Sequence, residues 1–264
     1  MRFSALTILA ALLTGPVPAI AADQAVPPAA HRAFYQLKLE QARGSDVVGA
    51  TGSMAYEVLD TCEGWATRQR LDMKVTNRDG QDIDMLSDYT TWESKDGLSM
   101  RFRMRQTTES AVTSEVAGEA TLLRPGGPGE VHYSEPEPGT KALPVGTLFP
   151  MAHTEAILAA AHAGKKFITL PLFDGTSEKG AQDSSVAIAG WNGPRTGKWP
   201  DLSTLSSGRV HVAFFDRDAA SQQPDYEVSM RYWDNGVADE LSMDFGDFVM
   251  KGTLDQLTVL PPGC

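Results

Sequence analysis

The chain has 264 residues and a formal net charge of −11. This acidic balance argues against nucleic acid as a partner, because binding phosphates requires a basic surface, and it disfavours broad electrostatic binding to anionic membranes. The length suits one large domain or two small ones and is ample for a sizeable hydrophobic core.

The N-terminus has the three-part layout of a secretory signal peptide over residues 1–21. Arg2 precedes the apolar run "FSALTILAALL", and Ala19 and Ala21 form a small-x-small cleavage motif. The run is shorter than the roughly 20 apolar residues of a membrane-spanning helix, and no later segment is apolar enough to span a bilayer. We therefore expect cleavage after Ala21 and export of the remaining chain.

Residues 22–30 are rich in Pro and Ala and are predicted to form a flexible leader. From there on, apolar and polar residues alternate with the period of two that is typical of β-strands. In "GLSMRFRMRQ" the apolar set Leu98, Met100, Phe102 and Met104 is expected to face inward. The same alternation predicts strands in "AFYQLKL", "GSMAYEVLD", "WATRQRLDMKV", "IDMLSDYTTWE" and "SEVAGEATLL".

One helix is predicted within residues 147–167, "TLFPMAHTEAILAAAHAGKKF". Thr147 is a residue type that caps helix N-termini, and Pro150 is tolerated in the first turn. Gly164 is a plausible C-terminal stop, because glycine adopts the backbone conformation that ends helices.

Strand patterns return after the helix in "KFITLPLF", "SSVAIAGW" and "GRVHVAFFD", and "DNG" between alternating runs predicts a hairpin near residues 234–236. About a dozen short strands with one helix and no alternation of strands and helices indicate a mainly β, antiparallel fold that is barrel-like or sandwich-like. A long meander with one helix suits a curved, half-barrel-like sheet that wraps around that helix. We expect residues 31–264 to form a single domain.

The chain has two cysteines, Cys62 and Cys264. In an oxidising compartment, the simplest arrangement is one disulfide between them, although two free thiols or an intermolecular bond remain as alternatives. On the chain-entropy model, closing so long a loop stabilises the fold by roughly 5 kcal/mol, as an upper figure. The bond would tie the end of the chain to an early strand.

Catalytic and metal-binding motifs are scarce. The histidines lack metal-ligand spacing, a GxSxG elbow is absent, and bridged cysteines cannot act as nucleophiles. The histidines are His31, His132, His153, His162 and His211. A hydrolase that uses paired carboxylates is a weak third hypothesis, with Asp82, Asp84, Asp88, Asp96, Asp234, Asp239, Asp244 and Asp247 as candidates. Solvated turns and strand faces explain these carboxylates as well, so no enzyme, cofactor or metal is predicted.

Two surfaces could bind a partner. The stripe formed by Arg101, Arg103 and Arg105 could recognise an anionic headgroup or an acidic partner, or it could be a solvated sheet face with carboxylates on the neighbouring strand. Methionines gather at inward-facing positions and could line an adaptable apolar pocket or simply fill the core. These methionines are Met54, Met73, Met100, Met104, Met230 and Met243.

Several segments occur in a characteristic order along the chain: "YQLKL", "GSMAYEVLDTCEGW", "WESKDGLSMRFRMR", "LPVGTLFPMAHTEAILAAAHAGKKF", "LFDG", "DNGVADELSMDFGDF" and the terminal cysteine. Through them, nearly all of the chain after residue 21 resembles the EipB family of periplasmic cell-envelope integrity proteins. The resemblance implies an antiparallel β-spiral that curls around a helix, with a disulfide between Cys62 and Cys264. It also implies location in the periplasm, a role in envelope integrity and stress resistance, and no established catalytic residues.

The leading hypothesis is therefore a non-enzymatic periplasmic protein that binds an envelope component or a partner protein. The alternative is a lipid or lipoprotein carrier with an apolar cavity inside the curved sheet, which would need a connected cavity of roughly 300 Å³ or more.

Overall fold

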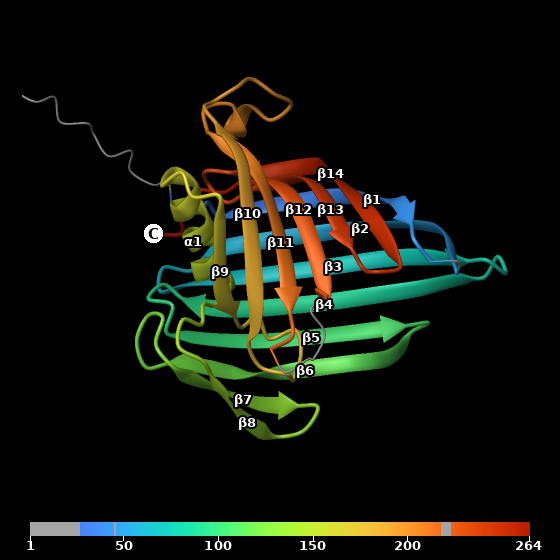
Figure 1. Ribbon diagram of the computed structural model, residues 1–264, viewed down its shortest axis with the longest axis horizontal. Helices are drawn as coiled ribbons and strands as arrows, with labels where there is room; N and C mark the ends of the chain where they lie inside the picture. The colour runs from blue at the N-terminus through green and yellow to red at the C-terminus, as the bar shows by residue number, and fades with distance from the viewer. Residues whose placement is uncertain (1–26, 45, 218–222) are drawn as a thin grey trace, which may run out of the picture.

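The computed structural model describes residues 27–44, 46–217 and 223–264 (Figure 1). The predicted signal peptide, with Arg2 and the cleavage motif, lies outside the described residues, as does most of the predicted leader. The last two leader residues are held in place, because the Ala29 N–H donates to the Asn235 carbonyl and the Ala30 carbonyl accepts from the Leu260 N–H.

The described residues form fourteen strands, one α-helix and one short 3₁₀ helix. The first eight strands are β1 (His31–Ala42), β2 (Val47–Asp60), β3 (Gly64–Asn77), β4 (Asp82–Ser94), β5 (Ser99–Thr108), β6 (Ala111–Leu122), β7 (Gly129–Glu135) and β8 (Gly139–Leu143). The helix α1 (Pro150–His162) follows, and then β9 (Phe167–Leu172), β10 (Gln182–Asn192), η1 (Pro200–Leu202), β11 (Ser207–Phe215), β12 (Tyr226–Trp233), β13 (Ala238–Asp244) and β14 (Phe248–Val259).

All fourteen strands belong to one antiparallel sheet, in the order β8 to β1 followed by β14 to β9. The sheet therefore consists of two meanders, β1–β8 and β9–β14, whose first and last strands pair with each other. In the part of the chain that the structure describes, the sheet stays open, with β8 and β9 at its two edges. The curved, half-barrel-like mainly β fold expected from the sequence is confirmed.

The curvature brings the two meanders face to face, with β10–β13 in front of β3–β6 in Figure 1. Alternation sets which side chains lie between them: in β1, Tyr35 and Leu37 are buried while Gln36 and Lys38 are exposed. The main core cluster draws on both meanders and on α1. A second cluster lies beneath β5–β8, around Phe102, Phe149 and Phe173.

The helix lies at one end of the curved sheet (Figure 1). Its side chains Ile157, Ala160 and Ala161 pack into the main core. It begins at Pro150 and stops where predicted: Gly164 adopts a positive φ of 69° and donates its N–H to the Ala161 carbonyl. The predicted cap is wrong.

The Thr147 hydroxyl donates to the Pro144 carbonyl instead of capping the helix. The first-turn N–H groups are bound by the side chain of Glu93, which reaches in from β4. A residue distant in sequence thus takes the place of a local cap.

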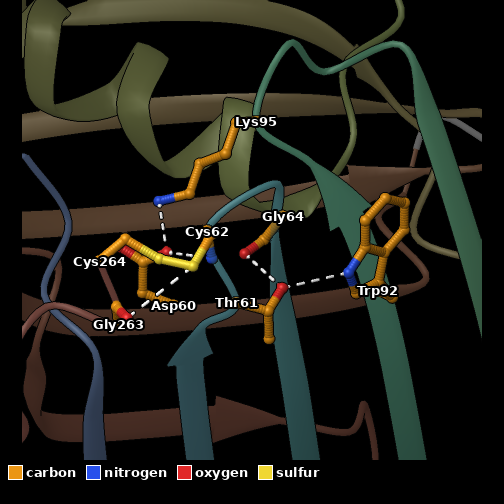
Figure 2. Close-up of a disulfide and its surroundings, with 8 residues drawn as sticks. All are labelled: Asp60, Thr61, Cys62, Gly64, Trp92, Lys95, Gly263 and Cys264. Carbon is orange, nitrogen blue, oxygen red and sulfur yellow. Dashed lines mark hydrogen bonds and ion pairs between the residues drawn. A yellow bond between two sulfur atoms is a disulfide. The ribbon is translucent and has the colours of Figure 1, made fainter.

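Cys62 and Cys264 are joined by a disulfide, with their Cα atoms 5.5 Å apart (Figure 2). Cys62 lies in the turn between β2 and β3, and Cys264 follows the end of β14. Because β1 is located between β2 and β14 in the sheet, the bond spans β1 and ties the two meanders together beside the β1–β14 pair that joins them.

The turn that carries Cys62 is held by its own polar contacts (Figure 2). Asp60 accepts the Cys62 N–H at 3.0 Å and contacts Lys95 Nζ at 3.1 Å. The Thr61 hydroxyl donates to the Gly64 carbonyl and accepts from the Trp92 indole N–H. These contacts fix Cys62 in a positive-φ conformation, φ 70°, from which it faces the chain terminus.

Candidate functional site

An apolar cleft of about 510 Å³ lies on the concave side of the sheet, where β3–β5 face β12–β14. Its volume falls within the range of roughly 300–1,000 Å³ that is usual for ligand sites. The side chains that point into it follow the inward phase of each strand. They are Gln69, Leu71, Met73, Met85, Ser87, Met104, Gln106, Thr108, Tyr226, Met243, Phe245 and Phe248.

None of the described residues that line this cleft is charged. Four of them are methionines, whose unbranched, polarisable side chains adapt to irregular apolar shapes. Phe245 stacks on Phe248 with ring centroids 5.1 Å apart, and Tyr226 lies against Phe245 at 5.4 Å. The cleft is therefore suited to a flexible, uncharged ligand.

A second hollow of about 260 Å³ continues the cleft toward α1 and shares Gln69, Tyr226 and Met243 with it. Aliphatic and aromatic side chains, including Met54 and Met230, line it. The two hollows together run from the open side of the sheet toward its helical end.

Buried tyrosines give this inner hollow its polar character without charge. Tyr35 donates its hydroxyl to the Ala238 carbonyl at 2.7 Å. Burial raises the pKa of Tyr56, Tyr226 and Tyr232, so all three hydroxyls stay neutral at physiological pH. They can offer hydrogen bonds to a neutral ligand and have no counterion to offer to a charged one.

Glu93, on β4, lies against the first turn of α1 and is only 2% exposed. The Met151 N–H donates to its Oε2 at 2.7 Å, and the Ala152 N–H donates to its Oε1 at 3.0 Å. Burial raises the pKa of Glu93 to about 7, although both N–H groups favour the ionised form. A single carboxyl thus anchors the first turn of α1 to β4.

His153 makes a second internal link from α1. Its Nε2 lies 2.7 Å from the Ser184 hydroxyl, which in turn donates to the Leu170 carbonyl at 3.0 Å. Burial lowers the pKa of His153 to about 4, so the neutral ring donates to Ser184. This histidine holds the helix to β9 and β10.

The predicted methionine faces are divided by the structure. Met54, Met73, Met104, Met230 and Met243 line the two hollows, whereas Met100 is fully buried in the second core cluster. Met85, at the mouth of the cleft and 38% exposed, was missed. The period of two along β4 could have indicated that Met85 faces inward, because it stands two positions before Ser87, which also lines the cleft.

The arginine stripe lies on the opposite, solvent-facing side of β5. Arg101 is 3.9 Å from Glu119, and Arg105 is 3.9 Å from Glu115. Arg103 also pairs with Glu115. All three guanidiniums therefore have carboxylates on the neighbouring strand β6, the arrangement of a solvated sheet face.

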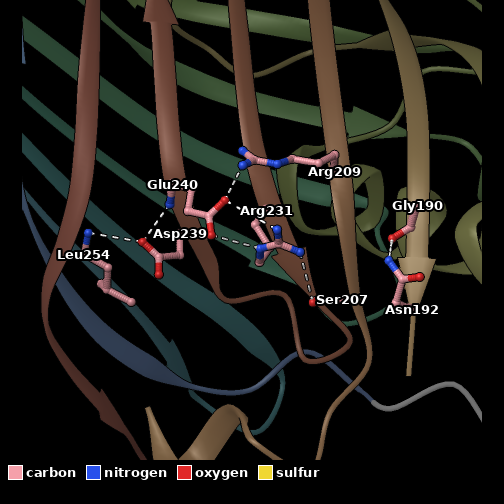
Figure 3. A network of polar contacts seen from close by, with 8 residues as sticks. All are labelled: Gly190, Asn192, Ser207, Arg209, Arg231, Asp239, Glu240 and Leu254. Carbon is pink, nitrogen blue, oxygen red and sulfur yellow. Dashed lines mark hydrogen bonds and ion pairs between the residues drawn. The ribbon is translucent and has the colours of Figure 1, made fainter. Parts of the chain in front are cut away.

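The acidic candidates are dispersed and serve local roles. Asp239 accepts the N–H groups of Glu240 and Leu254 (Figure 3). Burial acts to raise the pKa of Glu240, but Arg231 and Arg209 outweigh it and hold that pKa below its ordinary value.

The other acidic candidates either form ion pairs with arginines or lysines or make local hydrogen bonds. Asp88 pairs with Arg70, and both Asp82 and Asp84 contact Lys74. Asp244 pairs with Arg43, and Asp96 accepts from Ser94 and from the Leu98 N–H. Asp247 accepts the Arg43 N–H through its backbone carbonyl.

The remaining histidines also have local partners. His31 Nδ1 lies 2.7 Å from the Ala29 carbonyl, His132 contacts Glu130, and His211 contacts Glu227. His162 differs: its Nε2 is buried 3.1 Å from Asp234 Oδ1 but makes no hydrogen bond to any described residue. Within the described ranges, no group of three His, Cys, Asp or Glu residues could hold a metal ion.

The fold and the cleft define the class of protein: a β-barrel-like protein whose curved sheet stays open around an apolar hollow. The sequence model of the EipB-like family matches residues 22–261, and the chain belongs to this family. It is 31% identical to the cell envelope integrity protein EipB of Brucella abortus (strain 2308) over 260 residues, which cover 94% of this chain and 89% of that protein.

The fold likeness is equally extensive. A crystal structure of a beta-barrel-like protein of a domain of unknown function from Brucella abortus superposes with a TM-score of 0.82 at 30% identity. The match covers 90% of this chain and 100% of that one. Within the described residues, the structure contains no helix long and apolar enough to cross a membrane.

Proposed function

We propose that this protein supports the cell envelope from the periplasm, without catalysis, by holding one acyl chain of an envelope lipid or lipoprotein in its interior cleft. The observation that carries the proposal is the cleft of about 510 Å³, lined by uncharged and methionine-rich side chains. The name of the Brucella relative supports the envelope role, and the predicted signal peptide supports the compartment.

The chemistry of the lining favours an acyl chain over a charged small molecule. Burying an ionised group without a partner is strongly unfavourable, and of the described side chains in the cleft none carries a charge. A methylene chain, in contrast, gains about 0.8 kcal/mol for each CH₂ that it buries. A charged headgroup would remain at the mouth, beside Met85 and Thr108.

The test is displacement of a fluorescent fatty acid from the purified protein. Gln106 lines the cleft but is exposed, so Gln106→Trp places a bulky ring in the cleft without removing core packing. We expect the affinity for the probe to fall at least about tenfold, roughly 1.4 kcal/mol. Val48→Trp, at an exposed position outside the lining, is the matched control and should bind like wild type.

Equal probe affinity for wild type and Gln106→Trp would contradict binding in the cleft. Absence of measurable binding to the wild type would leave the role to a protein partner.

A further inference from the structure

A groove crosses the solvent-facing side of β14 and β1–β5, on the face opposite the cleft. It consists of two hollows, of about 520 and 370 Å³, that share Arg68 and Thr90. Five arginines line it: Arg32, Arg68, Arg70, Arg101 and Arg103. Of the predicted arginine stripe, Arg101 and Arg103 line the groove, whereas Arg105 lies outside its lining.

The charges in the groove do not cancel. Glu57 and Asp88 are the carboxylates among its described lining residues; Glu57 pairs with Arg32, and Asp88 accepts from Arg70 at 2.9 and 3.2 Å. Arg68, which both hollows share, is exposed and makes no ion pair with any other described residue. Arg101 and Arg103 pair with Glu119 and Glu115 on β6, outside the lining. The positive charge of the groove that no carboxylate of the described residues pairs with is therefore that of Arg68, on a chain whose net charge is −11.

The floor of the groove offers apolar contact between the arginines. Phe34 and Ala55 are direct partners across β1 and β2, and the small Ala55 leaves the space that one hollow occupies. In the other hollow, the Arg101 guanidinium lies 5.1 Å from the centre of the Trp92 ring. A chain segment with carboxylates and an occasional apolar side chain would match this arrangement, because guanidinium groups bind carboxylates through two parallel hydrogen bonds.

We propose that this groove binds an acidic segment of a partner protein, with Arg68 as its central contact. The overall negative charge disfavours an extended anionic membrane surface, which would face much more of the molecule than the groove. A segment confined to the groove interacts mainly with the arginines, since charges are screened beyond about 8 Å at physiological ionic strength. This proposal does not depend on a ligand in the cleft.

The experiment measures fluorescence anisotropy of a labelled peptide of alternating Glu and Ser with a central Phe, at low and high salt. We expect wild type to bind the peptide and to release it as salt rises. Arg68→Glu should weaken binding about three- to tenfold, because it replaces an attraction with a repulsion at an exposed site. Arg124→Glu changes an exposed arginine outside the groove and should leave the affinity within about twofold of wild type.

Equal peptide affinity for wild type and Arg68→Glu would overturn the proposal, as would absence of peptide binding at low salt. Sedimentation with phosphatidylglycerol vesicles is the second arm. Vesicle binding that Arg68→Glu abolishes, with no peptide binding, would assign the groove to a membrane surface and reject the protein segment.

Discussion

Replacing Glu93 by Gln should change how the stability of the protein depends on pH. Glu93 is buried between β4 and α1 and accepts two backbone N–H groups. Burial raises its pKa from 4.5 to about 7 in the folded state. Because the folded pKa is the higher one, the folded state binds more protons than the unfolded state between these values, and the free energy of unfolding falls as pH rises from 4.5 to 7.

The size of this effect follows from the pKa shift. Each pKa unit corresponds to about 1.36 kcal/mol, so a rise from 4.5 to about 7 amounts to about 3.4 kcal/mol. This rise already includes the opposing effect of the Met151 and Ala152 N–H groups, which favour the ionised carboxyl. We therefore expect wild type to lose about 3 kcal/mol relative to Glu93→Gln between pH 4.5 and pH 8.

Urea denaturation followed by tryptophan fluorescence at several pH values between 4.5 and 8 measures this difference. Glu93→Gln should gain stability relative to wild type as pH rises, whereas Glu119→Gln, at a 72% exposed carboxyl, should stay parallel to wild type. A stability difference between Glu93→Gln and wild type that is the same at every pH would refute the reasoning.

Two further predictions concern the disulfide and the close packing of a glycine. Cys62→Ser and Cys264→Ser should each lower the free energy of unfolding by about 2–5 kcal/mol without abolishing the sheet, because the disulfide restricts the unfolded chain; identical urea midpoints for wild type and both variants would contradict a stabilising bond. Gly175→Ala should destabilise by about 2 kcal/mol or more, because Gly175 has a φ of 71° and a Cβ there would collide with the Phe102 ring. Gly197→Ala, with open space around it, is the control, and equal thermal midpoints for the two variants would argue against the packing reason.

Sequence reasoning succeeded where structure is local. Alternation along β5 placed Met100 and Phe102 inside and Arg101 and Arg103 outside, and the structure agrees. The "DNG" motif gave the β12–β13 turn, in which Gly236 takes a φ of 79°. Both features depend on neighbours within a few residues.

Features made by distant segments could not be predicted in the same way. Pairing of β1 with β14 joins the first and last strands along the described chain, and no local pattern specifies it. The same holds for Glu93, whose partners Met151 and Ala152 lie on α1. A carboxyl at an inward-facing position of a strand was the available signal, and it identifies a buried charge without naming its partner.

The candidate sites depended on the curvature of the sheet. Inward-facing methionines were visible in the sequence, but only the approach of β3–β5 to β12–β14 separates those that line a cleft from Met100, which fills a core. Likewise, the spacing of the arginine stripe could not show that Glu115 and Glu119 stand opposite it, because that follows from the register of β6 against β5.

Mass spectrometry of an organic extract from protein purified out of its native compartment, without detergent, tests the central claim most directly. Binding of an acyl chain in the cleft predicts one lipid at near-stoichiometric amount from wild type and a much smaller amount from Gln106→Trp. An empty wild-type extract, obtained beside a lipid-carrying control protein that retains its ligand, would contradict the claim.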